Sequence, residues 1–270
     1  MEKKVKIMGI LNVTPDSFSD GGKYTLPQAA LQHALQLIHE GADIIDIGGE
    51  ASGPGSKYVP VQEEMRRVIL VTERLRRLRL RSPKPLISID TYKAEVAWNA
   101  IAAGASIVND ITALRGDPEM VGVIAKSGVF VVLMYAKDPT ARTTRLKKRY
   151  RDVIKTISDF LEERIDFALR AGIKHSQIII DPGMGAFVSM EPKYSYEILR
   201  RLRELKKFKC PILVGTSRKS FLPGTLEERL EPTLATNLLA IQNGADIIRV
   251  HDVAAHNRLV ETLQCYTLAA

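Results

Sequence analysis

The segment Gly41-Ala-Asp-Ile-Ile-Asp-Ile47 places a glycine that can end a helix directly before a short apolar run. The same arrangement returns at Gly104-Ala-Ser-Ile-Val-Asn109 and at Gly244-Ala-Asp-Ile-Ile-Arg-Val250, and Gly128 and Gly172 stand in related places. Glycine adopts the left-handed conformation that closes many helices. We therefore expect each of these turns to join the end of a helix to the start of a strand.

Short runs of apolar and β-branched residues recur along the whole chain, at 5–13, 43–47, 86–89, 106–111, 129–135, 178–180, 211–214 and 246–250. Longer segments with helical apolar spacing follow them, for example 29–39, 63–78, 94–103, 153–171, 196–205, 233–243 and 254–268. Strands this uniformly apolar are buried on both faces, as in a parallel sheet whose strands are connected by helices. Eight such units in 270 residues predict an α/β fold, a (β/α)₈ TIM barrel forming one domain over residues 1–270.

The composition is that of an ordinary globular chain, with 45% hydrophobic and 26% charged residues and a net charge of +8. The densest basic clusters, at 74–81 and 145–151, have leucine interleaved as amphipathic helices do and few aromatic residues nearby. We therefore expect solvated helix faces, and neither nucleic acid nor membrane as a partner. The two cysteines, Cys210 and Cys265, lie far apart without metal-ligand spacing. With no apolar run of bilayer length and no signal peptide, a cytoplasmic location is expected.

Polar residues follow nearly every predicted strand. They are Asn12, Glu50, Ser52, Asp90, Asn109, Asp110, Tyr135, Asp181, Ser217, Arg218, Lys219, Arg249, His251 and Asp252. Some of these side chains could merely cap the following helices. In a TIM barrel, however, the carboxyl ends of the strands carry the active site. The pattern predicts a single active site at this rim.

Two carboxylates and an amide at the rim suit a flat heterocycle. Asp90, Asn109 and Asp181 follow strands three, four and six, so their side chains would point into the barrel mouth. An amino group beside a ring N–H offers two parallel donors, which one carboxylate accepts in a fork geometry. We assign that role to Asp181.

Basic residues gather after the last two strands. Arg218 and Lys219 follow strand seven, and Arg249 and His251 lie at strand eight. The corresponding loops of TIM barrels commonly hold phosphate, and Gly215-Thr-Ser-Arg-Lys-Ser220 offers backbone N–H groups near a helix start. A phosphate-bearing substrate is therefore expected.

The loop that follows the first strand, Asn12 to Gly22, is polar and long enough to act as a lid. Asn12 offers a neutral oxygen to Mg²⁺, which usually combines one or two protein oxygens with substrate phosphate. No nucleophile with a partnered base is evident, and His251 alone suits a phosphate ligand as well as a general base. The residues favour displacement of pyrophosphate by a second substrate that enters from the loops.

Several motifs resemble those of the dihydropteroate synthase family, which joins a dihydropterin methyl diphosphate to p-aminobenzoate in folate biosynthesis. The resemblance covers essentially the whole chain. Its motifs are Ile7-Met-Gly-Ile-Leu-Asn-Val-Thr-Pro-Asp-Ser-Phe-Ser-Asp-Gly-Gly22, Asp43-Ile-Ile-Asp-Ile-Gly-Gly-Glu50, Ile89-Asp-Thr91, Val108-Asn-Asp110, Ile180-Asp-Pro-Gly183, Val214-Gly-Thr-Ser-Arg-Lys-Ser-Phe221 and Arg249-Val-His-Asp252. The first motif and the Ser-Arg-Lys motif are the most specific.

The resemblance implies a role for each matching residue. The residues that would hold the pterin ring are Asp90, Asn109, Asp181 and Lys219. Those that would bind the diphosphate are Asn12, Ser52, Arg249 and His251. Those that would contact the aryl acceptor are Ser52, Pro54 and Ser220. Asn12 would also ligate Mg²⁺, and Asp16, Asp20 and Lys219 would be catalytic. The resemblance further implies a homodimer, for which the sequence offers no interface patch.

Three departures from the family pattern fall in the loops that would receive the second substrate. Gly53 stands where the family usually has an arginine, and Ser52 replaces the usual threonine. Leu133-Met-Tyr-Ala-Lys137 replaces a Met-His-Met pattern, and Gly185-Ala-Phe-Val-Ser189 lacks the usual lysine. Alternatives are therefore a homologue with another aryl acceptor, a pterin-dependent methyltransferase domain that serves a corrinoid partner, or a pterin-binding protein without turnover.

Overall fold

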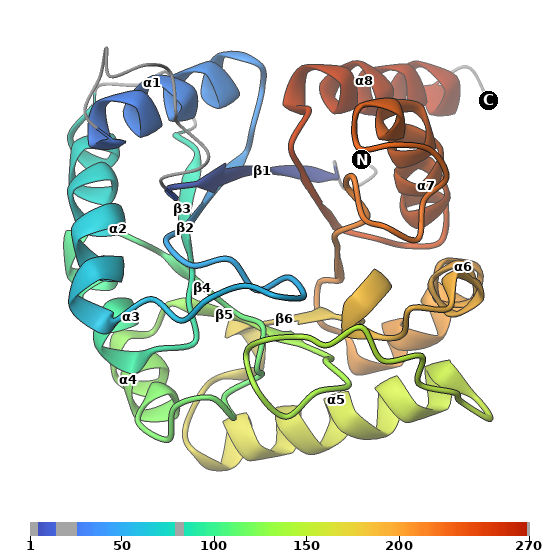
Figure 1. The fold of residues 1–270 in the computed structure, drawn as a ribbon, viewed down its shortest axis with the longest axis horizontal. Coiled ribbons are helices and arrows are strands. Elements are labelled where there is room, and N and C mark those ends of the chain that lie inside the picture. The colour runs from blue at the N-terminus through green and yellow to red at the C-terminus, as the bar shows by residue number, and fades with distance from the viewer. Residues whose placement is uncertain (1–4, 15–25, 79–83, 269–270) are drawn as a thin grey trace.

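Eight parallel strands form a barrel that α-helices surround (Figure 1). The computed structural model describes residues 5–14, 26–78 and 84–268. Hydrogen-bonded neighbours run in the order β6-β5-β4-β3-β2-β1-β8-β7, and a parallel bridge between Ile180 and Ile212 connects the two ends of that order. The predicted (β/α)₈ TIM barrel is therefore confirmed.

The elements alternate along the chain as the sequence predicts. The strands are β1 (Lys6–Asn12), β2 (Ile44–Gly48), β3 (Leu86–Asp90), β4 (Ile107–Asp110), β5 (Phe130–Met134), β6 (Ile178–Asp181), β7 (Leu213–Val214) and β8 (Ile247–Val250). The α-helices are α1 (Leu26–His39), α2 (Val61–Arg77), α3 (Ala94–Ala103), α4 (Met120–Ser127), α5 (Val153–Arg170), α6 (Pro192–Arg201), α7 (Leu230–Gln242) and α8 (Val253–Leu268). Only α4 has no counterpart among the segments named from the sequence. The segment predicted at 196–205 begins earlier, at Pro192, and its last turns continue as a 3₁₀ helix, Leu202–Phe208.

The five glycines predicted to end helices are found at helix ends. Gly41, Gly104, Gly128, Gly172 and Gly244 all have positive φ, between 75° and 118°. At Gly104 the backbone N–H returns to the carbonyl groups of the last helical turn. Each such turn reverses the chain from a helix into the next strand, which keeps the strands parallel.

One residue from each strand fills the lower half of the barrel. These residues are Met8, Ile44, Leu86, Ile107, Val132, Ile179, Leu213 and Ile247. Because side chains alternate along a strand, the next residues on the same face point inward one layer closer to the carboxyl ends. Several of those are polar, namely Asp46, Ser88, Asn109, Asp181 and Arg249. The apolar layer therefore forms the floor of a polar site.

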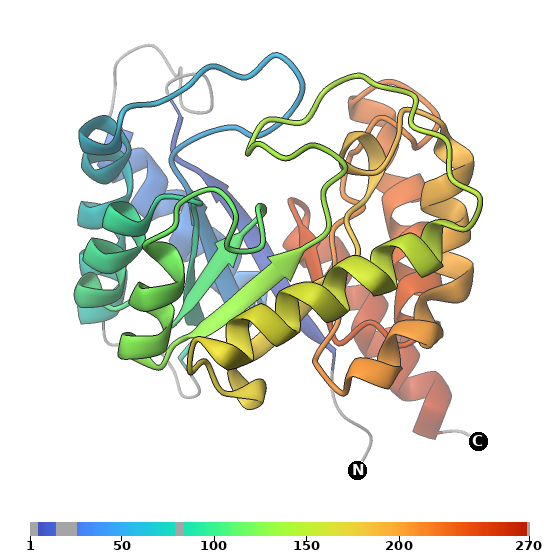
Figure 2. The same cartoon turned by 90° about the horizontal axis from the view of Figure 1, so that it is seen from below.

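The long loops lie at the end of the barrel opposite to the chain termini (Figure 2). The basic segment at 145–151, expected as an amphipathic helix, belongs instead to the β5–α5 loop, so that prediction is wrong. Its backbone is engaged by another loop, because the Met190 N–H donates to the Leu146 carbonyl and Ser189 donates to that of Lys148. Most of the predicted lid, including Asp16 and Asp20, lies outside the described residues. Within the described ranges, no helix has both the length and the apolar character that crossing a membrane requires.

Candidate active site

An arginine at the centre of the barrel joins two carboxylates. Arg249, on β8, donates from Nε to Asp46 Oδ2 at 2.6 Å and from Nη2 to Asp90 Oδ2 at 2.7 Å. Asp46 lies on β2 and is fully buried, whereas Asp90 ends β3 and is partly open to the mouth. The two bonds fix the plane of the guanidinium and leave Nη1 without a hydrogen bond to any described residue.

Asn109 joins the same cluster from β4. Its Nδ2 donates to Asp46 Oδ2 at 3.1 Å, and its side chain is almost completely buried. The other oxygen of Asp46, Oδ1, is buried and has no hydrogen-bond partner among the described residues. Burial raises the pKa of Asp90, and the adjacent Asp46 carboxylate adds to this rise while Arg249 opposes it.

A second carboxylate and cation face each other across β6 and β7. Asp181 ends β6, and its Oδ1 accepts the Gly183 N–H at 2.7 Å. Gly183 is required here, since its φ is +69° and a Cβ would stand 2.3 Å from the Tyr135 carbonyl oxygen. Lys219, on the β7–α7 loop, lies with Nζ 5.2 Å from the centre of the Phe187 ring.

Burial shifts the pKa values of Asp181 and Lys219 toward 7. Burial raises the pKa of Asp181 to about 6, although the Lys219 charge and the Gly183 hydrogen bond act in the opposite direction. Burial likewise lowers the pKa of Lys219 to about 8, and the Asp181 carboxylate limits the fall. A carboxylate that is poorly solvated and accepts few bonds is well suited to accept two N–H donors from a ligand.

His251 follows β8 and is neutral at pH 7. Burial, with the nearby charges of Arg249 and Arg218, lowers the pKa of His251 to about 4. Ser217 Oγ lies 2.9 Å from His251 Nδ1 and accepts the His251 backbone N–H. If the serine hydroxyl then donates to Nδ1, the ring proton is on Nε2, where it can serve a ligand.

Two of the four basic residues after strands seven and eight offer no free positive charge in the structure. His251 is neutral, and Arg218 forms a bidentate ion pair with Asp252, at 3.0 Å from Nε and 2.5 Å from Nη2. Arg218 has a left-handed backbone with φ of 54° and lies in the β7–α7 loop; the helix start expected near residues 215–220 is absent from these described residues, since α7 begins at Leu230. Arg249 is also paired with two carboxylates but keeps Nη1 for a ligand, and Lys219 forms no ion pair with a described residue.

The remaining predicted residues are distributed around the rim. Asn12 ends β1 and is exposed; Ser52 and Pro54 are partly buried on the β2–α2 loop; and Ser220 is exposed on the β7–α7 loop. Ser52 and Asp90 line one small cavity. The described residues hold no cluster of three or more His, Cys, Asp and Glu side chains that could bind a metal.

Asp46 is the residue that the argument from sequence missed. Asp46 lies inside β2, whereas the residues predicted for the site stand at the ends of their strands. The signal was present, because Asp46 shares the inward face of the strand with Ile44 and Gly48. In contrast, Asp110 turns out to be structural, since its carboxylate accepts the Thr112 and Leu114 N–H groups of a tight turn.

Comparison with known proteins connects this site to one family. The family described as "Pterin binding enzyme" matches residues 8–251. Dihydropteroate synthase of Bacillus subtilis is 43% identical over 266 residues, covering 97% of this chain and 88% of the relative. The enzyme of Clostridium beijerinckii is 41% identical, covering 95% of this chain and 92% of the relative.

Solved structures agree with these relatives. Xanthomonas albilineans dihydropteroate synthase with 4-aminobenzoic acid superposes with a TM-score of 0.90 at 41% identity, covering 98% of this chain and 93% of that chain. The same enzyme in complex with 7,8-dihydropteroate gives a TM-score of 0.86, covering 98% and 94%. The chain thus belongs to the pterin-binding enzyme family, and matches dihydropteroate synthases along nearly its whole length.

Proposed function

We propose that the protein is a dihydropteroate synthase, a transferase of folate biosynthesis. It joins (7,8-dihydropterin-6-yl)methyl diphosphate to 4-aminobenzoate and releases 7,8-dihydropteroate and pyrophosphate. The observation that carries this proposal is the buried Asp181 carboxylate beside Lys219, at the mouth of a barrel that also holds Arg249. The relatives and the structural neighbours support the same reaction.

The pterin ring binds at the floor of the mouth. Asp181 accepts two parallel donors, the 2-amino group and the adjacent ring N–H, in a fork geometry. Asn109 and Asp90 complete the polar wall, and Lys219 donates to an acceptor on the ring. Asp181, Asn109 and Asp90 are positioned by strands, so they form this wall before the ligand arrives.

The diphosphate lies nearer to the rim. Arg249 has Nη1 available, and His251 in its neutral form donates from Nε2. Ser52 adds a hydroxyl from the β2–α2 loop. Because two carboxylates already hold Arg249, its side chain loses little further freedom when it binds an anion.

Magnesium fits the rim only if the substrate supplies most of its ligands. Asn12 is exposed at the end of β1 and offers one neutral oxygen, and no acidic cluster stands near it in the described part of the chain. Mg²⁺ commonly accepts such a partial protein site together with substrate phosphate and water. When bound, the ion would neutralise charge on the departing pyrophosphate.

The reaction breaks the bond between the pterin methylene carbon and the diphosphate oxygen. The amine of 4-aminobenzoate forms the new carbon–nitrogen bond and then loses a proton, while pyrophosphate takes the electron pair of the broken bond. Arg249 and His251 stabilise that leaving group, and Asp181 holds the ring in place. Asp16 and Asp20, which lie outside the described residues, are proposed to act from the first loop.

The aryl acceptor enters between the β2–α2 and β7–α7 loops, where Ser52, Pro54 and Ser220 are proposed to contact it. Transfer to a different aryl acceptor is the second candidate, because Gly53 has no side chain and no neighbour within 4 Å of a Cβ position. A methyltransferase reaction is not favoured, since a methylated pterin would make no use of the anion site around Arg249.

A homodimer in the cytoplasm is part of the proposal. Helix α7 buries the polar residues Thr233, Thr236 and Asn237 and turns leucines outward, with Leu239 45% exposed. An outward apolar face on a helix is typical of a protein interface. Sedimentation analysis of the wild type and of Leu239→Glu tests this point, and a monomeric wild type would contradict it.

The test of the proposed function is direct detection of the product. The purified protein is incubated with the pterin diphosphate, Mg²⁺ and 4-aminobenzoate, and 7,8-dihydropteroate is measured by mass spectrometry. We expect product that depends on both substrates. Tight pterin binding without dihydropteroate would overturn the synthase assignment.

A further inference from the structure

The β5–α5 loop, residues 135–152, lies at the rim of the barrel above α5, where the β2–α2 loop approaches it (Figures 1 and 2). At its far end it is attached to the β6–α6 loop, where the Tyr150 hydroxyl donates to the Val188 carbonyl at 2.7 Å. In its middle, the Thr143 N–H donates to the Ser52 carbonyl at 3.3 Å. One loop therefore joins the β2–α2 loop to the β6–α6 loop.

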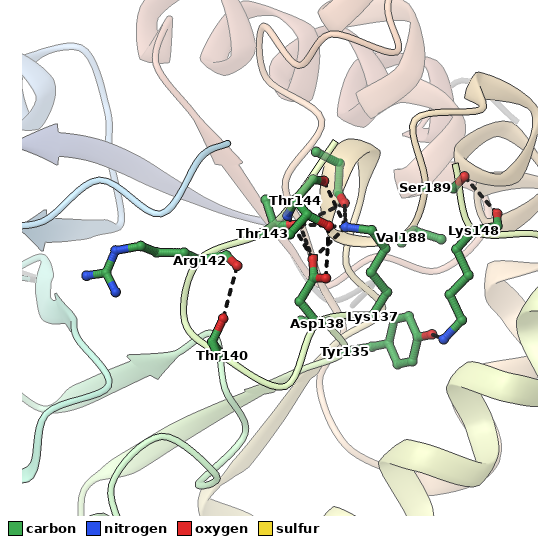
Figure 3. Close-up of polar contacts among 12 residues, drawn as sticks. Tyr135, Lys137, Asp138, Thr140, Arg142, Thr143, Thr144, Lys148, Val188 and Ser189 are labelled. Carbon is green, nitrogen blue, oxygen red and sulfur yellow. Dashed lines mark hydrogen bonds and ion pairs between the residues drawn. The ribbon is translucent and has the colours of Figure 1, made fainter. Parts of the chain in front are cut away.

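A buried lysine fixes the shape of the middle of this loop. The Lys137 ammonium donates to Asp138 Oδ2 at 2.5 Å, to Thr143 Oγ1 at 2.9 Å and to the Ala186 carbonyl at 2.8 Å, and its side chain is fully buried (Figure 3). Asp138 accepts three further bonds from Thr143 and Thr144. Although burial acts in the opposite direction, these bonds lower the pKa of Asp138 to about 2. The turn between residues 138 and 144 is thereby held in one conformation.

Arg142 projects from this turn away from the lysine cluster (Figure 3). Its Nη2 donates to Glu50 Oε1, and its guanidinium carbon lies 5.4 Å from the centre of the Tyr58 ring. Glu50 is held in turn by Lys93 Nζ at 2.5 Å and by the Val59 N–H at 3.1 Å. The Glu50 and Lys93 side chains are each only 6% exposed, so solvent screens this pair weakly.

The tip of the β2–α2 loop needs such an external contact. A Cβ built at Gly53 or at Gly55 meets nothing within 4 Å, and Gly55 has a φ of +86°. Ala51, Gly53 and Gly55 are exposed. A short glycine-containing tip without packing of its own is conformationally free unless another element holds it.

We propose that Arg142 is a positioning residue for the aryl acceptor. Its ion pair with Glu50 fixes the β2–α2 loop against the β5–α5 loop and so holds Ser52 and Pro54 at the entrance. The argument rests on the proposed function only for the identity of the acceptor, since the contact between the loops is independent of it. Pterin binding at the floor of the barrel does not depend on Arg142.

Steady-state kinetics with both substrates tests this role. Arg142→Gln is expected to raise KM for 4-aminobenzoate by about tenfold, a change of about 1.4 kcal/mol, with kcat and KM for the pterin diphosphate nearly unchanged. Arg142→Lys keeps a charge for Glu50 and should recover part of the loss. Arg145→Gln removes an exposed arginine of the same loop and is the matched control. Equal acceptor KM values for Arg142→Gln and Arg145→Gln would overturn the proposal.

Hydrogen exchange separates this inference from the proposed function. In the full chain without substrate, Arg142→Gln should accelerate amide exchange in residues 50–59 by about tenfold, a local loss of about 1.4 kcal/mol, and leave α5 unchanged. This readout needs no turnover, so it remains valid if the wild type fails to make dihydropteroate. Unchanged exchange in residues 50–59 would show that the ion pair does not hold the loop.

Discussion

Replacement of Asp181 by asparagine should separate ligand binding from stability. Asp181 is 6% exposed, and its carboxylate is proposed to accept two N–H donors from the pterin. A hydrogen bond to a charged group contributes about 1.5–3 kcal/mol, so the loss of two is about 3 kcal/mol or more. Since asparagine presents one acceptor and one donor, we expect pterin affinity to fall by roughly 100-fold or more.

The same substitution should not destabilise the fold at neutral pH. Burial raises the pKa of Asp181 to about 6 from an ordinary 3.8, so the folded state binds the proton more tightly than the unfolded state does. The stabilisation that this group gives is complete below pH 3.8 and is lost as pH rises through 6. At pH 7 the ionised group therefore costs about 3 kcal/mol, reckoned at about 1.4 kcal/mol per pKa unit, which the amide avoids.

Isothermal titration with 6-hydroxymethyl-7,8-dihydropterin and thermal unfolding between pH 4 and 8 measure both effects. Asp159→Asn, which changes an exposed carboxylate paired with Lys155 on α5, is the control and should leave the pterin affinity unchanged. An affinity for Asp181→Asn within about threefold of the wild type would refute the role assigned to Asp181. An unfolding temperature of Asp181→Asn well below that of the wild type at pH 7 would refute the electrostatic argument.

Other predictions concern pH, Asp46 and the metal. The value of kcat/KM for the pterin diphosphate should rise with pH through about 6 as Asp181 loses its proton, and should fall through about 8 as Lys219 loses its own. Lys219→Ala should lower kcat/KM strongly and abolish the fall at alkaline pH. An unchanged fall in this variant would show that Lys219 does not cause it. Asp46→Asn should free Arg249 and lower kcat/KM for the diphosphate by about tenfold while pterin affinity changes little, so a normal kcat/KM would show that Asp46 does not position Arg249. Chelation of Mg²⁺ should abolish turnover but leave the free pterin able to bind by titration, and full activity in the presence of a chelator would contradict the role proposed for the ion.

The fold was largely predictable because its signals are local. Helix-ending glycines such as Gly41 and Gly244 stand directly before uniformly apolar strands, and both features depend on a few neighbouring residues. Helix α4 was missed because its eight residues include Gly122 and give little periodicity. The basic segment at 145–151 was misread because it holds a single leucine, Leu146, which defines no helical period. Its backbone is bonded instead to the β6–α6 loop.

In the candidate site too, the local features were predictable and the contacts between distant segments were not. Residues at the carboxyl end of a strand, such as Asp90 and Asp181, could be placed at the mouth once the barrel was predicted. Ion pairs between distant segments could not be predicted, because no local pattern shows that Arg249 lies between Asp46 and Asp90 or that Arg142 contacts Glu50. The neutral state of His251 also follows only from burial and from surrounding charges that the fold brings together.

The most direct test of the central claim is pyrophosphate release from (7,8-dihydropterin-6-yl)methyl diphosphate with Mg²⁺ present. Three samples contain 4-aminobenzoate, 4-hydroxybenzoate or no acceptor. The proposed function predicts release that depends on 4-aminobenzoate and equals the dihydropteroate formed, mole for mole. Binding of the pterin substrate with no release on addition of 4-aminobenzoate would contradict it.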